Sequence, residues 1–229
     1  MVTPWTPLES NPDVLTPYIN RLGAVGVNVS DVFSLDDDCL GWAVPPTTFA
    51  YILCFRLDRE KEKLEREKGE APESVSVPEK VWFTRQTVPN ACCTVAILHS
   101  IFNSGVSLAP DSPLALFAQT TKDMSAEDRA AALHSATDIA ELHKEFGQLG
   151  ATGVPGTGED IDLHYAAIVP VTQESEGALV VGLDGRQPSP SVHGPFPEGF
   201  VVAGAKVLRS LIAKGDQNSP FSVVALSTV

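Results

Sequence analysis

Four short apolar segments constrain the fold of this chain of 229 residues more than any other feature of its sequence. Each is almost continuously apolar and rich in β-branched or aromatic residues, which is typical of a strand covered on both faces. The polar stretch TQESEG joins the second segment to the third and predicts a hairpin. VWFT, at 81–84, predicts a further short strand. The four segments are TTFAYILCFRL (47–57), LHYAAIVPV (163–171), ALVVGLDG (178–185) and FSVVALSTV (221–229).

Helical patterns alternate with these strands. The segment 125–147 begins with a capping box at Ser125 and ends at Gly147, and it predicts one helix. The charged run REKEKLEREK, at 59–68, predicts a solvated helix surface with opposite charges three and four residues apart. The alternation predicts one α/β or α+β domain over 1–229, with a sheet covered by helices. The remaining helical patterns are 11–23, 92–102, 113–124 and 200–214.

Charge and composition exclude several classes of protein. The net charge of −13 argues against binding to nucleic acid or to an anionic membrane. No apolar run reaches the roughly 20 residues that a membrane-spanning helix needs. The first residues, MVTPWTPLESNPDV, lack the pattern of a secretory signal, and four cysteines without a CxxC pair are typical of a reducing compartment. We therefore expect a cytoplasmic protein, and a nuclear location also stays open.

Two adjacent cysteines, Cys92 and Cys93, stand at the start of the helical pattern 92–102. Asn90 is a favoured N-cap type, which predicts a helix that begins near Ala91. In the first turn, unpaired N–H groups and the helix dipole stabilise a thiolate, and a nucleophilic cysteine requires this. Helical position alone does not choose between the two thiols. The alternative is a pair of buried cysteines that act as small apolar side chains, and burial statistics alone favour it. Adjacent cysteines also lack the spacing of metal ligands.

A nucleophilic thiol needs a general base, and the base needs an orienting partner. His164 opens one apolar strand and Asp184 ends the return strand of the predicted hairpin, so the hairpin can hold the two side chains together. Taken alone, Asp184-Gly185 is typical of a turn. Gln86, six residues before Cys92, can fold back over the helix start and donate a hydrogen bond to an oxyanion.

The other histidines are poorer candidates for the base. His99 lies two turns beyond Cys92 on the same helical pattern, which is too far to take its proton. His134 and His143 lie in an amphipathic segment, where we expect both to be exposed.

The glycine-rich segment GQLGATGVPGTGEDID, at 147–162, cannot form a stable helix or strand. One interpretation is a linker between domains. The other is a lid or binding loop, which is the more common use of so long a loop inside a compact domain.

The blocks QTVPNACCT, DLHY and LDGRQPSP, with a following HG, resemble the three catalytic blocks of the ubiquitin C-terminal hydrolases. The similarity is to the short members that consist of the catalytic domain alone, and it covers essentially the whole chain. It implies that Cys92 is the nucleophile, His164 the general base and acid, Asp184 the orienting acid and Gln86 the oxyanion donor. The family commonly has glycine directly after the nucleophile, where this chain has Cys93.

The resemblance also implies a papain-like cysteine protease fold, with an antiparallel-rich sheet between helical layers and a knotted backbone. The glycine-rich segment then corresponds to a crossover loop, at about 147–162, that limits the size of the leaving group. The residues that would contact ubiquitin are Trp5, Pro7, Leu8, Glu9, Asp13, Asp31 and Leu163.

The implied activity is a deubiquitinating thiol hydrolase. It would remove small adducts or peptides from the C-terminal glycine of ubiquitin through a thioester, as a monomer and without a metal or cofactor. NEDD8 stays open as a second substrate. Two alternatives also remain, which are a catalytically silent ubiquitin-binding module and a papain-like peptidase or acyltransferase that acts on other substrates.

Overall fold

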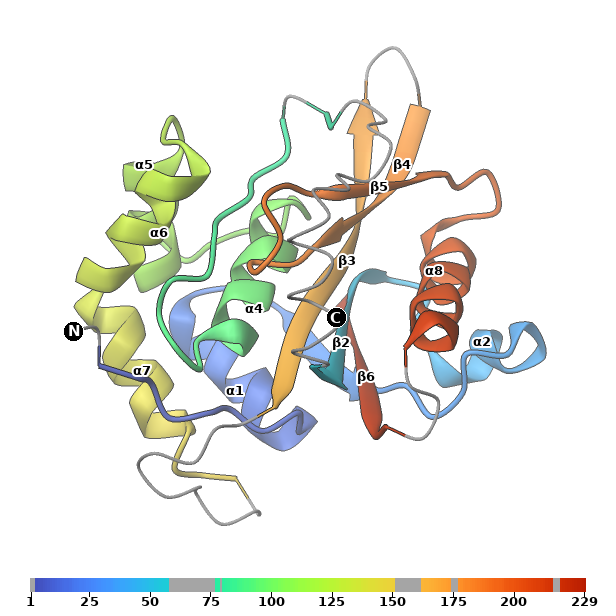
Figure 1. Cartoon of the computed structure of the whole chain (residues 1–229), viewed down its shortest axis with the longest axis horizontal. Coiled ribbons are helices and arrows are strands. Elements are labelled where there is room, and N and C mark those ends of the chain that lie inside the picture. Colours follow the sequence, from blue (N-terminus) through green and yellow to red (C-terminus); the bar gives the residue numbers. More distant parts are fainter. Residues whose placement is uncertain (1–2, 58–76, 79, 151–161, 174–176, 216–218) are drawn as a thin grey trace.

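A single six-stranded sheet organises the computed structural model, which describes residues 3–57, 77–78, 80–150, 162–173, 177–215 and 219–229. The strand order is β1-β6-β2-β3-β4-β5, and every neighbouring pair is antiparallel (Figure 1). The predicted antiparallel sheet and its hairpin, now β3–β4, are thereby confirmed. The strands are β1 (Val27–Asp31), β2 (Thr48–Arg56), β3 (Leu163–Gln173), β4 (Gly177–Leu183), β5 (Ser191–Pro195) and β6 (Phe221–Thr228).

Helices cover both faces of the sheet. One layer contains α1, α4, α5, α6 and α7, and α2 and α8 lie on the opposite side (Figure 1). Within the described part of the chain, no helix is both long and apolar enough to cross a membrane. The helices are α1 (Pro12–Leu22), α2 (Asp37–Ala43), α4 (Cys92–Phe102), α5 (Pro113–Thr121), α6 (Ala126–Ser135), α7 (Thr137–Phe146) and α8 (Phe200–Lys214).

Strand β2 separates two apolar cores. Its side chains alternate between the faces, so Ala50 and Ile52 pack in the core on the α4 side, and Tyr51 and Leu53 pack in the core on the α8 side. Both faces are therefore buried, which is why the segment is apolar almost throughout. Helix α4 is likewise buried from Cys92 to Ile101, as its sequence predicts.

The prediction of a strand at 81–84 is wrong. This segment is extended, but its backbone pairs with side chains of α4 rather than with a strand. The N–H group of Trp82 donates to Oδ1 of Asn103 at 2.9 Å, and that of Thr84 donates to Nε2 of His99 at 3.1 Å. These bonds hold the segment that precedes Cys92 and Cys93 against α4.

The prediction of one helix over 125–147 is also wrong, because the segment divides into α6 and α7 at Ala136. A continuous helix would place Leu133 and Ile139 about 120° apart around its axis. Both side chains are buried, at 2% and 1% exposure. The break at Ala136 lets both of them face the core.

Three short elements, β1, β5 and α2, have no counterpart among the predicted elements. Strands β1 and β5 form the two edges of the sheet, where an uninterrupted apolar run is not needed. The charged run 59–68 and most of the glycine-rich segment lie outside the described residues. The knot and the division into a single domain over 1–229 stay predictions.

Candidate active site

Cys92 is the first residue of α4 and lies at the edge of a pocket. Helix α4 begins one residue later than expected, and the predicted N-cap role of Asn90 is wrong. Asn90 has left-handed backbone (φ 64°), and its side-chain amide donates to the carbonyl of Trp5 at 3.1 Å. Ala91 occupies the N-cap position and has no side chain that could bind the first N–H groups. The positive end of the α4 dipole therefore lies at Cys92.

The two adjacent thiols lie in different environments. Cys92 is 8% exposed and reaches the pocket, whereas Cys93 is 0% exposed and packs in the core. Burial raises the pKa of the Cys93 thiol well above its usual range, so this thiol keeps its proton. The tertiary structure therefore distinguishes two side chains that helical position alone could not.

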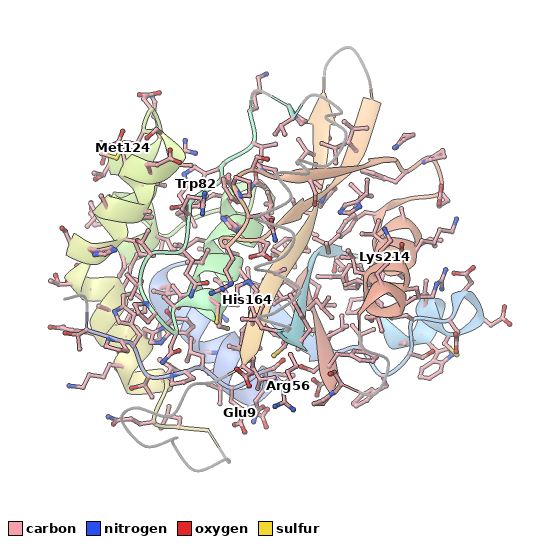
Figure 2. The ribbon with its side chains drawn as sticks, viewed as in Figure 1. Glu9, Arg56, Trp82, Met124, His164 and Lys214 are labelled. Atoms are coloured by element: carbon pink, nitrogen blue, oxygen red, sulfur yellow. The ribbon has the colours of Figure 1, made fainter. Side chains whose placement is uncertain are left out.

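His164 and Asp184 meet as the hairpin predicts. His164 is the second residue of β3, Asp184 directly follows β4, and Nε2 of His164 lies 2.6 Å from Oδ1 of Asp184. The same carboxylate oxygen accepts a hydrogen bond from the N–H group of Arg186 at 2.8 Å. With Nε2 bound to Asp184, the Nδ1 atom of the imidazole is available for the Cys92 thiol. Figure 2 labels His164 near the centre of the molecule, on β3 where this strand contacts α4.

The pKa shifts of this pair agree with its geometry. Burial of His164 opposes the protonated imidazole, but hydrogen bonds to Asp184 and Cys92 outweigh burial and raise the pKa of His164 to about 9. For Asp184, burial acts to raise the pKa, but the bond to His164 and its charge lower it. Both shifts favour an imidazolium beside a carboxylate.

Gln86 is tied to the turn that follows Asp184. Its N–H group donates to the carbonyl of Gly185 at 2.8 Å, and a Cβ atom at Gly185 would lie 2.9 Å from Cβ of Gln86. Only glycine permits this approach. The side-chain amide of Gln86 donates to the carbonyl of Val88 at 3.3 Å, and Oε1 of Gln86 is buried without a hydrogen-bond partner among the described residues. The carboxamide is thus held close to the start of α4 by a single long bond.

The pocket beside Cys92 contains three of the predicted substrate contacts, which are Pro7, Leu8 and Leu163. Two further residues line it that the sequence interpretation did not assign to the site, Asn90 and Tyr165. Tyr165 directly follows His164, and Asn90 lies two positions before Cys92, so proximity to the motifs could have indicated both.

The other predicted contacts do not line this pocket. Trp5 is half-buried, with its ring centroid 4.5 Å from that of His143. Glu9 lies against Gly150, where a Cβ atom would come within 2.8 Å of its carboxylate. Asp13 is exposed in the first turn of α1, and Asp31 ends β1.

One histidine is placed differently from its prediction. His134 is exposed as expected, but His143 is fully buried at 0% exposure. Helix α7 buries Ile139, His143 and Phe146, which share one face at spacings of four and three. The apolar residues on either side of His143 could have indicated its burial.

Metal-ligating side chains do not gather at this site. Across the described ranges, no group of three or more His, Cys, Asp or Glu side chains could hold a metal ion.

Comparison with known proteins identifies the family of this chain. The family model described as ubiquitin carboxyl-terminal hydrolase, family 1, matches residues 5–213. A ubiquitin carboxyl-terminal hydrolase of Drosophila melanogaster is 37% identical over 97% of both chains, and human isozyme L1 is 32% identical over 96% of both. The solved Trichinella spiralis UCH37 catalytic domain, bound to ubiquitin vinyl methyl ester, has a TM-score of 0.77 at 24% identity and covers 98% of this chain and 96% of its own. The chain therefore belongs to family 1 of the ubiquitin carboxyl-terminal hydrolases, which are cysteine peptidases.

Proposed function

We propose that this enzyme cleaves the bond after the C-terminal glycine of ubiquitin with a triad of Cys92, His164 and Asp184. The observation that carries the proposal is the 2.6 Å contact between His164 and Asp184 beside a cysteine at a helix start. The names of the relatives and the ubiquitin derivative bound to the Trichinella protein support ubiquitin as the substrate.

The first half of the reaction forms a thioester. Nδ1 of His164 takes the proton of the Cys92 thiol, and the thiolate attacks the carbonyl carbon of the terminal glycine of ubiquitin. The carbonyl π electrons move to oxygen and form an oxyanion. When this intermediate collapses, the C–N bond breaks and the imidazolium of His164 gives its proton to the leaving amine. A pKa of about 9 for His164 suits it to hold the proton between these two steps.

The second half returns the enzyme to its starting state. Neutral His164 takes a proton from water as the water oxygen attacks the thioester carbonyl. The C–S bond then breaks, the imidazolium of His164 returns its proton to the Cys92 thiolate, and ubiquitin leaves as a carboxylate after its new carboxyl group gives its proton to solvent. Asp184 keeps its charge throughout and orients the imidazole, and its lowered pKa supports this role.

Gln86 is proposed to donate to the oxyanion together with a backbone N–H group at the start of α4. Its side-chain amide donates a long hydrogen bond, 3.3 Å, to the Val88 carbonyl. Replacing this bond by one to a charged oxygen costs little free energy, because bonds to charged acceptors are stronger.

The pocket suits a chain end without side chains. Pro7, Leu8 and Leu163 are apolar walls beside Cys92, and a glycine end passes such walls without a clash. We further propose that Glu9, Asp13 and Asp31 meet the arginines of the ubiquitin tail and that Trp5 supports the ubiquitin body. NEDD8 as a second substrate, a monomeric state, a cytoplasmic or nuclear location and the size limit set by the crossover loop stay predictions. Residues 151–161 of that loop lie outside the described chain.

A decisive test is hydrolysis of a ubiquitin C-terminal fluorogenic amide by the wild type and by Cys92→Ala. We expect turnover by the wild type and none by the variant. Binding of ubiquitin with neither turnover of the amide nor labelling of Cys92 by a ubiquitin-derived electrophile would instead identify a silent binding module. Turnover of unrelated peptide amides that free ubiquitin does not inhibit would favour the peptidase alternative.

A further inference from the structure

A buried chain of hydrogen bonds connects four parts of the molecule next to the pocket. The Tyr18 hydroxyl lies 2.7 Å from Oγ1 of Thr94, Thr94 Oγ1 lies 2.7 Å from Nδ1 of His143, and Nε2 of His143 lies 2.5 Å from the carbonyl oxygen of Thr6. The three side chains come from α1, α4 and α7, and each is 0% exposed. The carbonyl belongs to the N-terminal segment, here residues 5–8.

The direction of every bond in this chain follows from its last acceptor. A carbonyl oxygen only accepts, so Nε2 of His143 carries the hydrogen and donates to Thr6. In a neutral imidazole Nδ1 is then an acceptor, so the Thr94 hydroxyl donates to it and accepts from Tyr18. Burial, opposed only in part by the bond to Thr6, lowers the pKa of His143 to about 4, which agrees with the neutral form. A proton on Nδ1 would reverse the bond to Thr94 and leave the buried Thr94 hydroxyl hydrogen without this acceptor.

The N-terminal segment forms one wall of the pocket at Cys92, through Pro7 and Leu8. Three other bonds hold its two ends. The N–H group of Trp5 donates to Pro89 at 3.0 Å, Asn90 donates to the Trp5 carbonyl at 3.1 Å, and Tyr165 donates to the Leu8 carbonyl at 2.9 Å. Thr6 lies between these ends. His143 therefore binds the middle of the N-terminal segment, at Thr6 directly before Pro7.

We propose that His143 is a positioning residue for substrate binding, and that it holds the pocket wall of Pro7 and Leu8 at a fixed distance from Cys92 through its Nε2–H bond to Thr6. Thr94 lies two positions after Cys92 on α4, and its bond to Nδ1 leaves Nε2–H as the donor toward Thr6. The inference rests on the proposed function. It requires that the bond to Thr6 affects KM, because the wall contacts the substrate and not the reacting atoms.

Two substitutions separate the two bonds of His143. In His143→Gln, the amide nitrogen is as many bonds from Cα as Nε2 of histidine, so the variant can keep the bond to Thr6. In His143→Asn, the amide oxygen stands where Nδ1 stands, so the variant can keep the bond from Thr94 and loses the bond to Thr6. The two variants are each other's control for burial of a neutral amide in place of the imidazole.

Steady-state kinetics on the ubiquitin fluorogenic amide is the first measurement. We expect His143→Asn to raise KM about tenfold with kcat within about twofold, and His143→Gln to keep KM within about threefold of the wild type. A larger KM for His143→Gln than for His143→Asn would overturn the proposal, since the bond to Thr94 would then matter. A fall in kcat alone in either variant would overturn it as well.

Amide hydrogen exchange of residues 3–9, without any substrate, is the second measurement and does not depend on the proposed function. We expect faster exchange in His143→Asn than in the wild type or in His143→Gln. Equal exchange in all three proteins would overturn the positioning role. If the wild type hydrolyses no ubiquitin derivative, the proposed function fails, and the exchange result still decides whether His143 holds the wall.

Discussion

At the scale of single residues, the site depends on which of two neighbouring thiols meets the pocket. Cys92 does, while the Cys93 side chain is enclosed by the core and keeps its proton. Cys93 stands where the family commonly has glycine, and its helical backbone requires no positive φ, so a small side chain is accommodated.

Substitution of each thiol should give different results. We expect Cys92→Ser to lower kcat for the ubiquitin amide by about 10³-fold or more, because the alcohol is a much poorer nucleophile. Cys93→Gly should keep kcat/KM within about tenfold but lower the free energy of unfolding by about 2 kcal/mol, from lost burial and from glycine in a helix. Similar losses of activity in both variants would contradict a single nucleophile.

Asp184→Asn should separate orientation from binding. We expect kcat to fall by about 10²–10⁴-fold with little change in KM, because the imidazole loses its orienting partner. The pKa of His164, raised to about 9 in the wild type, should fall in the variant. A raised pKa stabilises the fold below the unfolded value near 6.5, and this contribution is lost as the pH rises through 9. NMR titration of His164 and urea unfolding between pH 6 and 9 test both statements, and an unchanged titration would place the acid elsewhere.

At the scale of secondary-structure elements, two buried histidines join α4 and α7 to their surroundings. His99 of α4 binds the extended segment at Thr84, and His143 of α7 binds Thr94 and Thr6. Burial is the main cause that lowers the pKa of both imidazoles to about 4. These hydrogen bonds fix the positions of α4 and α7 relative to the segments that they contact. Because protonation of either imidazole is unfavourable in the folded state, the free energy of unfolding depends on pH.

Acid should therefore destabilise the fold over a defined range. A folded-state pKa below the unfolded value means that the unfolded chain takes up the proton first as pH falls. The contribution of each histidine to the free energy of unfolding is then fully present above about pH 6.5 and decreases toward pH 4, by about 3 kcal/mol at most for each. Urea unfolding of His143→Gln should show a shallower decrease than the wild type, whereas exposed His134→Gln should match the wild type. Parallel curves for all three proteins would show that His143 does not contribute.

At the scale of the whole molecule, charge and architecture act together. The chain carries a net charge of −13, and it is proposed to bind a substrate tail that contains arginines. The strand order places β3 between β2 and β4, and His164, near the start of β3, pairs with Phe55 of β2. A rigid site within an acidic protein should gain association rate from long-range attraction.

Added salt should consequently weaken substrate binding and leave the rate of the chemical step unchanged. We expect kcat/KM for the ubiquitin amide to fall several-fold between about 50 mM and about 500 mM NaCl, mainly through KM, because the Debye length shortens. Alkylation of Cys92 by neutral iodoacetamide over the same range is the control and should change little. A kcat/KM that is independent of salt would mean that the acidic residues do not meet the substrate.

The sequence by itself determined the central strands, the buried helix α4 and the hairpin that joins His164 to Asp184. These features depend on continuous apolar runs and on a short connection, which are local properties of the chain. Only the tertiary structure decided the break at Ala136, the edge strands, the side-chain pairing of 81–84 and the hydrogen-bond partners of His143. Some of these depend on a partner far along the chain, since β1 pairs with β6, and His143 and Thr6 are 137 positions apart. The reason is physical, since a buried polar group must find a hydrogen-bond partner and the fold alone determines which partner lies within reach.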